Sequence, residues 1–274
     1  MNPIRPAAVA GTFYPAQAAI LRQNLQHYLR DAPALLSGGQ ETSPWPKALI
    51  VPHAGYPYSG PTAASAYRSL APGRGKIQRV VLLGPAHRVP FRGIALSGAG
   101  AFQTPLGVLP VDHAGVTAIA QLPQVLELPI AHAQEHALEV QLPFLQEVLG
   151  TVPILPLVVG EASPREVAEV LDILWDGPES VILISSDLSH YHPYAEARRI
   201  DNTTVRQILH PGGTPIHHAQ ACGAIPINGL LQTTHRHRLQ PCLLDLRNSG
   251  DTAGSRDAVV GYAAFAFFAE STTS

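Results

Sequence analysis

The sequence predicts an α/β fold with a central, mostly parallel or mixed sheet that is flanked by helices on both faces. Short runs rich in Val, Ile and Leu alternate with segments of helical spacing for most of the chain. The runs lack polar alternation, which is typical of strands that are covered on both sides. Hydrophobic residues make up 46% of the 274 residues and charged residues 14%, so apolar material is ample for such a core.

Six runs are predicted to form strands. They span residues 47–52, 79–84, 154–160, 181–186, 242–246 and 258–269. The first five are continuous apolar stretches that suit central strands. The last run mixes small and aromatic residues and suits a closing strand.

Three segments with helical spacing lie between these runs. They span residues 17–30, 135–149 and 163–175. Pro143 must kink the second helix or lie near one of its ends, because proline lacks the N–H of a helix interior. Ser163 is a candidate N-cap that forms a capping box with Glu166. Residues 102–112 interrupt the alternation and predict a hairpin or an extended excursion around Gly107.

The remaining features predict one cytosolic domain that spans residues 1–274. Neither an internal repeat nor a long linker is evident, and residues 37–46 are expected to form a loop. Eighteen basic and twenty acidic residues are spread along the chain, which argues against a nucleic-acid partner. Signal-peptide and membrane-spanning patterns are lacking, which predicts cytoplasmic localisation without a membrane partner. Two cysteines are too few for a disulfide scaffold.

Ionisable residues follow three of the predicted strands. His53 follows the first strand, His87 follows the second, and Asp187 with His190 follows 181–186. Ligands of open α/β sheets bind beyond the carboxyl ends of the strands, so we expect these side chains to meet in one cleft. A single histidine at a strand end would indicate only a hydrogen-bonded structural residue. Three converging strands favour a functional site.

Two other segments are candidates to reach that cleft. His136 and Glu139 are three residues apart and share a helix face, although a capping residue and a solvated glutamate would fit as well. Cys222 precedes a predicted helix, where the helix dipole would lower its pKa. It fits equally well as a small buried hydrophobe. Cys242 lies in a predicted strand and is expected in the core.

Eight motifs resemble the Memo family, which is called AmmeMemoRadiSam system protein B in many bacteria and archaea. They are PAAVAGTFYP (6–15), VPHAGYPYSG (51–60), LLGPAHRVP (82–90), QTPLGVLPVD (103–112), EHALEVQLPFL (135–145), PILPLVVG (153–160), SSDLSHY (185–191) and ACGAIPINGLL (221–231). The resemblance covers nearly the whole chain in the expected order. It implies a fold similar to the class III extradiol (LigB-like) dioxygenases, which are non-haem iron enzymes.

The resemblance also implies a metal site and its surroundings. His53, His87 and Cys222 match the metal ligands of the family. The polar residues around that site, which we expect to act in catalysis, are His190, His136, Asp187 and Glu139. Two imidazoles and a thiolate suit iron(II) or copper(I), and also zinc(II). A cysteine where the dioxygenases carry a carboxylate puts ring cleavage by their usual route in doubt.

Two functions follow as expectations. The first is a redox metalloprotein that acts on an unknown substrate, for example a phenol. The second is a non-catalytic adaptor that binds a phosphorylated or anionic ligand, such as a peptide, in the same pocket. The family name also implies AMMECR-type and radical S-adenosylmethionine proteins as partners in a modification pathway. A serine hydrolase is disfavoured, because the chain has no G-x-S-x-G elbow.

Overall fold

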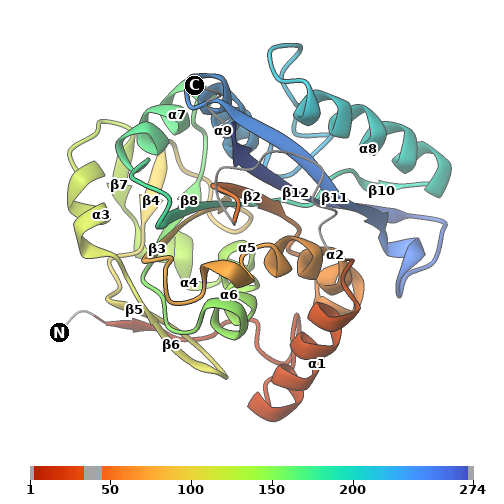
Figure 1. Cartoon of the computed structure of the whole chain (residues 1–274), viewed down its shortest axis with the longest axis horizontal. Helices are drawn as coiled ribbons and strands as arrows, with labels where there is room; N and C mark the ends of the chain where they lie inside the picture. Colours follow the sequence, from red (N-terminus) through yellow and green to blue (C-terminus); the bar gives the residue numbers. More distant parts are fainter. Residues whose placement is uncertain (1–2, 34–44, 271–274) are drawn as a thin grey trace.

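The apolar runs of the sequence form neighbouring strands of one mixed sheet (Figure 1). The computed structural model describes residues 3–33 and 45–270, and this sheet has nine strands within those residues. The strands are β2 (Ala48–Val51), β3 (Arg79–Pro85), β4 (Ile94–Leu96), β7 (Val125–Glu127), β8 (Ile154–Val159), β9 (Ser180–Ser185), β10 (His190–His192), β11 (Leu239–Asn248) and β12 (Val259–Ala269). Their order is β10-β12-β2-β9-β3-β8-β4-β7, and β11 pairs with β12.

The four central strands run in the same direction. β2 pairs in parallel with β9, β9 with β3, and β3 with β8. β12 is antiparallel to β2, and β4 is antiparallel to β8. The carboxyl ends of the central strands therefore lie along one edge of the sheet, as the strand-end argument required.

Both faces of the sheet are buried, because successive side chains of a strand point to opposite sides. In β2, Leu49 and Val51 belong to one apolar core, while Ala48 and Ile50 belong to the other. β3 alternates between the same two cores. This double burial explains why these strands read as continuous apolar runs, and it confirms the predicted fold class.

The two cores are closed by two groups of helices, which Figure 1 shows on opposite sides of the sheet. The first core contains residues of α1 (Ala18–Asp31), α2 (Tyr56–Arg68), α4 (Pro129–Ala133), α5 (His136–Glu139) and α6 (Leu142–Leu149). The second contains residues of α3 (His113–Ile119), α7 (Pro164–Ile173), α8 (Tyr194–Leu209) and α9 (Ala224–Arg236). Two short 3-10 turns, Ala71–Gly73 and Ser249–Asp251, complete the elements.

Local sequence signals explain where several elements begin. The Ser163–Glu166 capping box is present at the start of α7, as predicted. The single helix expected over 135–149 is divided into α5 and α6, and Pro143 lies in the first turn of α6. A proline is tolerated in a first turn, since the N–H that it lacks has no helical partner there.

The predicted hairpin belongs to a second, three-stranded sheet. β5 (Ala101–Thr104) and β6 (Gly107–Pro110) are antiparallel, and β1 (Ile4–Arg5) pairs in parallel with β5. Gly107 has a φ of 124°, a conformation that favours glycine over residues with a Cβ. This sheet holds the start of the described chain near α4 and α5.

Two expectations about burial need correction. Cys242 is exposed rather than in the core, and the 242–246 run is partly exposed within the longer strand β11. β11 pairs only with β12 among the described strands, so the run is not a central strand. Most of the loop expected at 37–46 lies outside the described residues. Within the described ranges, none of the helices has the length and apolar character to cross a bilayer.

Candidate metal centre

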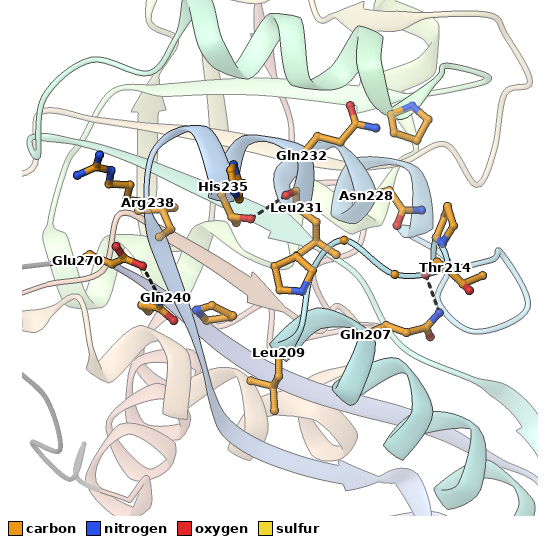
Figure 2. Close-up of a pocket in the computed structure, with 18 residues that line it drawn as sticks. Gln207, Leu209, Thr214, Asn228, Leu231, Gln232, His235, Arg238, Gln240 and Glu270 are labelled. Atoms are coloured by element: carbon orange, nitrogen blue, oxygen red, sulfur yellow. Dashed lines mark hydrogen bonds between the residues drawn. The ribbon is translucent and has the colours of Figure 1, made fainter.

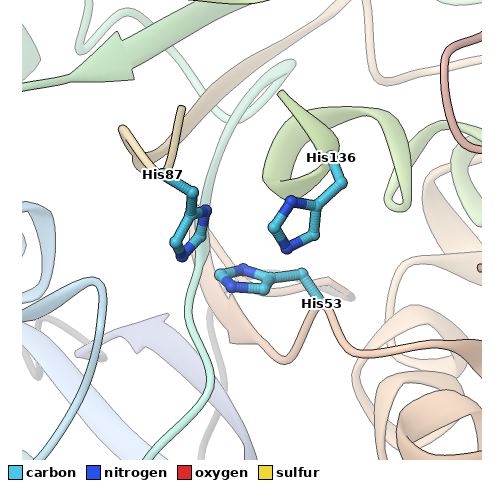
Figure 3. A group of neighbouring side chains, drawn as sticks. All are labelled: His53, His87 and His136. Carbon is cyan, nitrogen blue, oxygen red and sulfur yellow. The ribbon is translucent and has the colours of Figure 1, made fainter. Parts of the chain in front are cut away.

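Three histidines meet at the carboxyl edge of the central strands. His53 lies just after β2, His87 lies just after β3, and His136 is the first residue of α5. One ring nitrogen from each histidine lies within 4.8 Å of those of the other two. Figure 3 shows the three imidazole rings converging from separate segments of the chain. His53 and His87 were expected here from their places after the strands, and His136 was the helical candidate for the same cleft.

His53 is held from both sides of its ring and by its backbone. Its Nδ1 lies 2.9 Å from Ser185 Oγ, and its backbone N–H donates to Asp187 Oδ1 at 2.7 Å. Its Nε2 lies 3.3 Å from Cys222 Sγ. The side chain is 2% exposed, so its orientation depends on these neighbours and not on solvent.

His87 is oriented by a buried carboxylate. Glu135 accepts the backbone N–H of His87 at 2.7 Å, and His87 Nδ1 lies 2.9 Å from the other Glu135 oxygen. Burial raises the pKa of Glu135. The hydrogen bonds and the charge of His87, together with the hydrogen bond from Ala137 N–H, have the larger effect and lower this pKa to about 2. Glu135 is therefore an anion, and the His87 ring donates to it through Nδ1. This leaves Nε2 of His87 available as a ligand.

His136 stacks on His87, with ring centroids 4.6 Å apart and 28° between the planes. Its Nδ1 lies 3.3 Å from Glu135 Oε1, but the contact lacks hydrogen-bond geometry. Among the described residues, this buried nitrogen has no hydrogen-bond partner. A buried polar atom without a partner is costly in a native protein and requires an explanation.

Burial favours the neutral form of two of the three histidines, His53 and His136. Burial, together with the positive charge that His87 could carry, lowers the pKa of His53 to about 3. Burial and the charge of His53 lower the pKa of His136 to about 4. Neutral imidazoles keep the lone pairs that a metal ion needs. The His87 side chain is 27% exposed, so the cluster is accessible from its side.

Cys222 lies beside the cluster, but its protonation differs from the expectation. The residue immediately precedes the N-cap of α9, Gly223, as the sequence indicated. Burial raises the pKa of Cys222 to about 12, and the charge of Asp187 acts in the same direction. Desolvation therefore exceeds the helix-dipole effect, and the expected lowering of the pKa is wrong. Without a metal, Cys222 is a neutral thiol.

Asp187 and His190 flank the cluster. Asp187 is 4% exposed and accepts the His53 N–H, so it fixes the loop after β2. Burial raises the pKa of Asp187. His190 begins β10, is half-buried, and lies close enough for its charge to affect the pKa values of His53 and Asp187.

Glu139 is engaged elsewhere. Its carboxylate accepts from the Arg5 guanidinium, from the backbone N–H of Ala8 at 2.8 Å and of Val9 at 3.0 Å, and from the Tyr14 hydroxyl. The side chain is fully buried. Four donors saturate the carboxylate, so the structure gives Glu139 the task of fixing the N-terminal segment against α5. It does not place this carboxylate in the histidine cluster.

The donor set fits a transition-metal ion. Neutral imidazoles suit zinc, copper, iron and nickel, and each of the three histidines contributes one ring nitrogen to the cluster. Glu135 and Ser185, which orient two of the rings, were missed by the sequence reasoning. Glu135 could have been suspected, because a glutamate directly precedes His136 at the start of a helix. Ser185 carries no such signal.

A cavity that none of the three histidines lines lies elsewhere in the molecule. It has a volume of about 740 Å³ and lies between the ends of α8 and α9 and the start of β11. Figure 2 shows Gln207, Asn228 and His235 around it. None of the residues predicted for the site lines this cavity. It has no group of neighbouring ionisable side chains comparable to the histidine cluster among the described residues.

Comparisons with known proteins match the chain over most of its length. The model of the Memo-like protein family matches residues 5–266. A MEMO1 family protein of Metallosphaera sedula is 34% identical over 282 residues, which cover 96% of this chain and 99% of that protein. One from Methanopyrus kandleri is 35% identical, covering 96% of this chain and 98% of its own.

One solved structure shares the fold. It is the crystal structure of an uncharacterised protein from Escherichia coli K12, with a TM-score of 0.51 and 13% sequence identity. The match covers 80% of this chain and 98% of that chain. The likeness therefore concerns the architecture of the two chains.

Proposed function

This chain belongs to the Memo-like protein family, and we propose that it is a metal-dependent oxidoreductase that holds one iron or copper ion on His53, His87 and His136. The observation that carries the proposal is the convergence of three imidazole nitrogens within 4.8 Å. Each ring comes from a different segment of the chain. Three protonated imidazoles this close together would repel one another, but burial keeps the rings of His53 and His136 neutral.

Cys222 supports a redox metal over a purely structural one. Its sulfur lies 3.3 Å from His53 Nε2, within reach of an ion bound by that nitrogen. A metal-bound thiol loses its proton and becomes a soft ligand, which suits copper(I) and thiolate-ligated iron. The carboxylates of Asp187, Glu135 and Glu139 all have other partners, so a two-histidine, one-carboxylate iron site is disfavoured here.

The surrounding side chains would handle protons, and the bound ion would supply the electron transfer that none of these side chains can provide. His190 is half-buried at the rim and is the proposed acid or base. Asp187 holds the loop that carries His53. The exposed side of His87 leaves an approach for a small substrate. Phenols are the first class to test, because the family resemblance implies a fold similar to that of the class III extradiol dioxygenases.

Elemental analysis after anaerobic purification tests the metal. We expect one iron or copper per chain in the wild type and its loss in His53→Ala and His136→Ala. His132→Gln is a matched control, because His132 is a buried histidine outside the cluster whose Nε2 bonds the Ala95 carbonyl at 2.9 Å. Cys222→Ala tests whether the thiol is a metal ligand, because its metal content should fall only if Cys222 binds the ion. A wild type that binds neither Fe(II), Cu(I) nor Zn(II) would overturn the proposal.

Dioxygen uptake with catechols and other phenols tests the chemistry. Uptake that requires both the metal and His53 supports an oxidoreductase. Tight binding of phosphate or a phosphopeptide, unchanged in His53→Ala and without any dioxygen uptake, would favour the adaptor function instead.

A further inference from the structure

The hydroxyl of Ser185 links His53 to the helix that carries His136. Ser185 Oγ lies 2.6 Å from the Ala137 carbonyl, 2.8 Å from Gln141 Nε2 and 2.9 Å from His53 Nδ1. Ser185 and Gln141 are fully buried, so water does not compete for these contacts. One hydroxyl with one proton must satisfy three polar neighbours.

The orientation of the Gln141 amide is fixed by its other partners. Gln141 Nε2 lies 2.9 Å from the Pro52 carbonyl, which can only accept a hydrogen bond. The Tyr67 hydroxyl donates to Gln141 Oε1 at 2.7 Å. Reversing the amide would place its oxygen against the Pro52 carbonyl. Gln141 therefore donates to Ser185, and Ser185 accepts.

The proton of Ser185 is then committed as well. The Ala137 carbonyl can only accept, and an oxygen–oxygen contact of 2.6 Å requires a proton between the two atoms. Ser185 therefore donates to Ala137 and has only a lone pair left for His53. Since the serine cannot donate to Nδ1, the His53 ring must donate from Nδ1.

We propose that Ser185 and Gln141 are positioning residues that hold neutral His53 as the Nδ1–H tautomer, with the lone pair of Nε2 directed to the cluster. In the metal-free protein, the Cys222 thiol donates to that lone pair across 3.3 Å. The consequence for metal affinity rests on the proposed metal centre, whereas the tautomer does not.

Nitrogen-15 NMR of the metal-free protein with labelled histidines tests the tautomer directly. The spectrum is recorded at a pH where the imidazoles are neutral, and the signals of His53 are identified by their loss in His53→Gln. We expect a protonated Nδ1 and an unprotonated Nε2 in the wild type. A protonated Nε2 would overturn the proposal, and this measurement needs no Ser185 variant to fold.

Ser185→Ala tests the positioning role. Removal of the acceptor should allow the Nε2–H tautomer and weaken Zn(II) binding about 10- to 100-fold, as loss of an orienting partner does in other metal sites. Ser65→Ala is the matched control, because Ser65 is a buried serine in α2 whose hydroxyl donates to the Pro61 carbonyl. It should change neither the tautomer nor the affinity.

The outcomes of the two readouts are separable. An unchanged His53 tautomer in Ser185→Ala, or an unchanged Zn(II) affinity despite a shifted tautomer, would refute the positioning role. A wild type with the Nδ1–H tautomer but no affinity for Zn(II) would refute the metal centre and leave the tautomer assignment standing.

Discussion

Two glutamates on one short turn serve different purposes, although they lie only four residues apart. Glu135 caps α5 by accepting the Ala137 N–H, and it binds His87 through both backbone and ring. Glu139 pairs with Arg5 and accepts two backbone N–H groups of the N-terminal segment. The first contacts a proposed ligand, and the second contacts only the scaffold.

Replacement of each glutamate by glutamine should therefore impair different properties, metal affinity for Glu135 and stability for Glu139. Glu135→Gln removes the anion that orients His87, and we expect Zn(II) affinity to fall about 10- to 100-fold. Glu139→Gln leaves Arg5 without its buried counter-ion and should lower the free energy of unfolding by about 3–5 kcal/mol. Zinc titration and urea unfolding of both variants measure the two effects. Loss of affinity in Glu139→Gln with unchanged stability would contradict this division.

The sequence predicted the residues that follow the strands better than the residues that orient them. His53, His87, Asp187 and His190 were found because parallel strands deliver their last residues to one edge. Ser185 is the last residue of β9, and its role appears only when α5, α6 and the loop after β2 are placed around it. The pKa of Cys222 was missed because burial, which exceeds the dipole effect, depends on the packed structure.

At the scale of elements, the cluster depends on the close approach of α5 to β3. Gly84 lies directly beneath α5. A Cβ added at this position would lie 2.9 Å from Leu138 Cδ2 and 3.2 Å from Ala137 Cβ. The 135–149 segment was predicted as one helix because its apolar spacing continues through the break. The break allows α5 to turn His136 towards the strand ends while α6 packs in the first core.

Gly84→Ala tests this dependence. The added methyl group should push α5 away from β3, lowering the free energy of unfolding by about 1–3 kcal/mol and weakening Zn(II) binding through His136. Gly213→Ala is the control, because an added Cβ there meets no atom within 4 Å. The measurements are urea unfolding and zinc titration. An unaltered Zn(II) affinity in a destabilised Gly84→Ala would show that the position of α5 does not matter to the metal.

At the scale of the whole molecule, the fold buries three histidines in their neutral form. Burial lowers the pKa of His53 to about 3 and those of His132 and His136 to about 4, from an ordinary value of 6.5. The unfolded chain takes up protons on these residues below pH 6.5, whereas the native protein does not. Stability is therefore lost as the pH falls. Asp201 acts in the opposite direction, since burial raises its pKa to about 6 and the native protein keeps a proton there that the unfolded chain has lost.

His132 allows this loss of stability in acid to be measured at a histidine outside the proposed metal site. It lies in α4, and its Nε2 donates to the Ala95 carbonyl. Within the part of the chain that the structure describes, its buried Nδ1 has no partner that could accept a second proton. Between pH 6.5 and about 4, this residue should cost about 1.4 kcal/mol of stability per pH unit. His132→Gln keeps a donor for Ala95 but cannot titrate. Urea unfolding of the chelator-treated protein across this range should give a shallower pH dependence for the variant, by about one proton. Equal slopes for the variant and the wild type would mean that His132 is already protonated in the native protein, and that packing around α4 tolerates a buried charge.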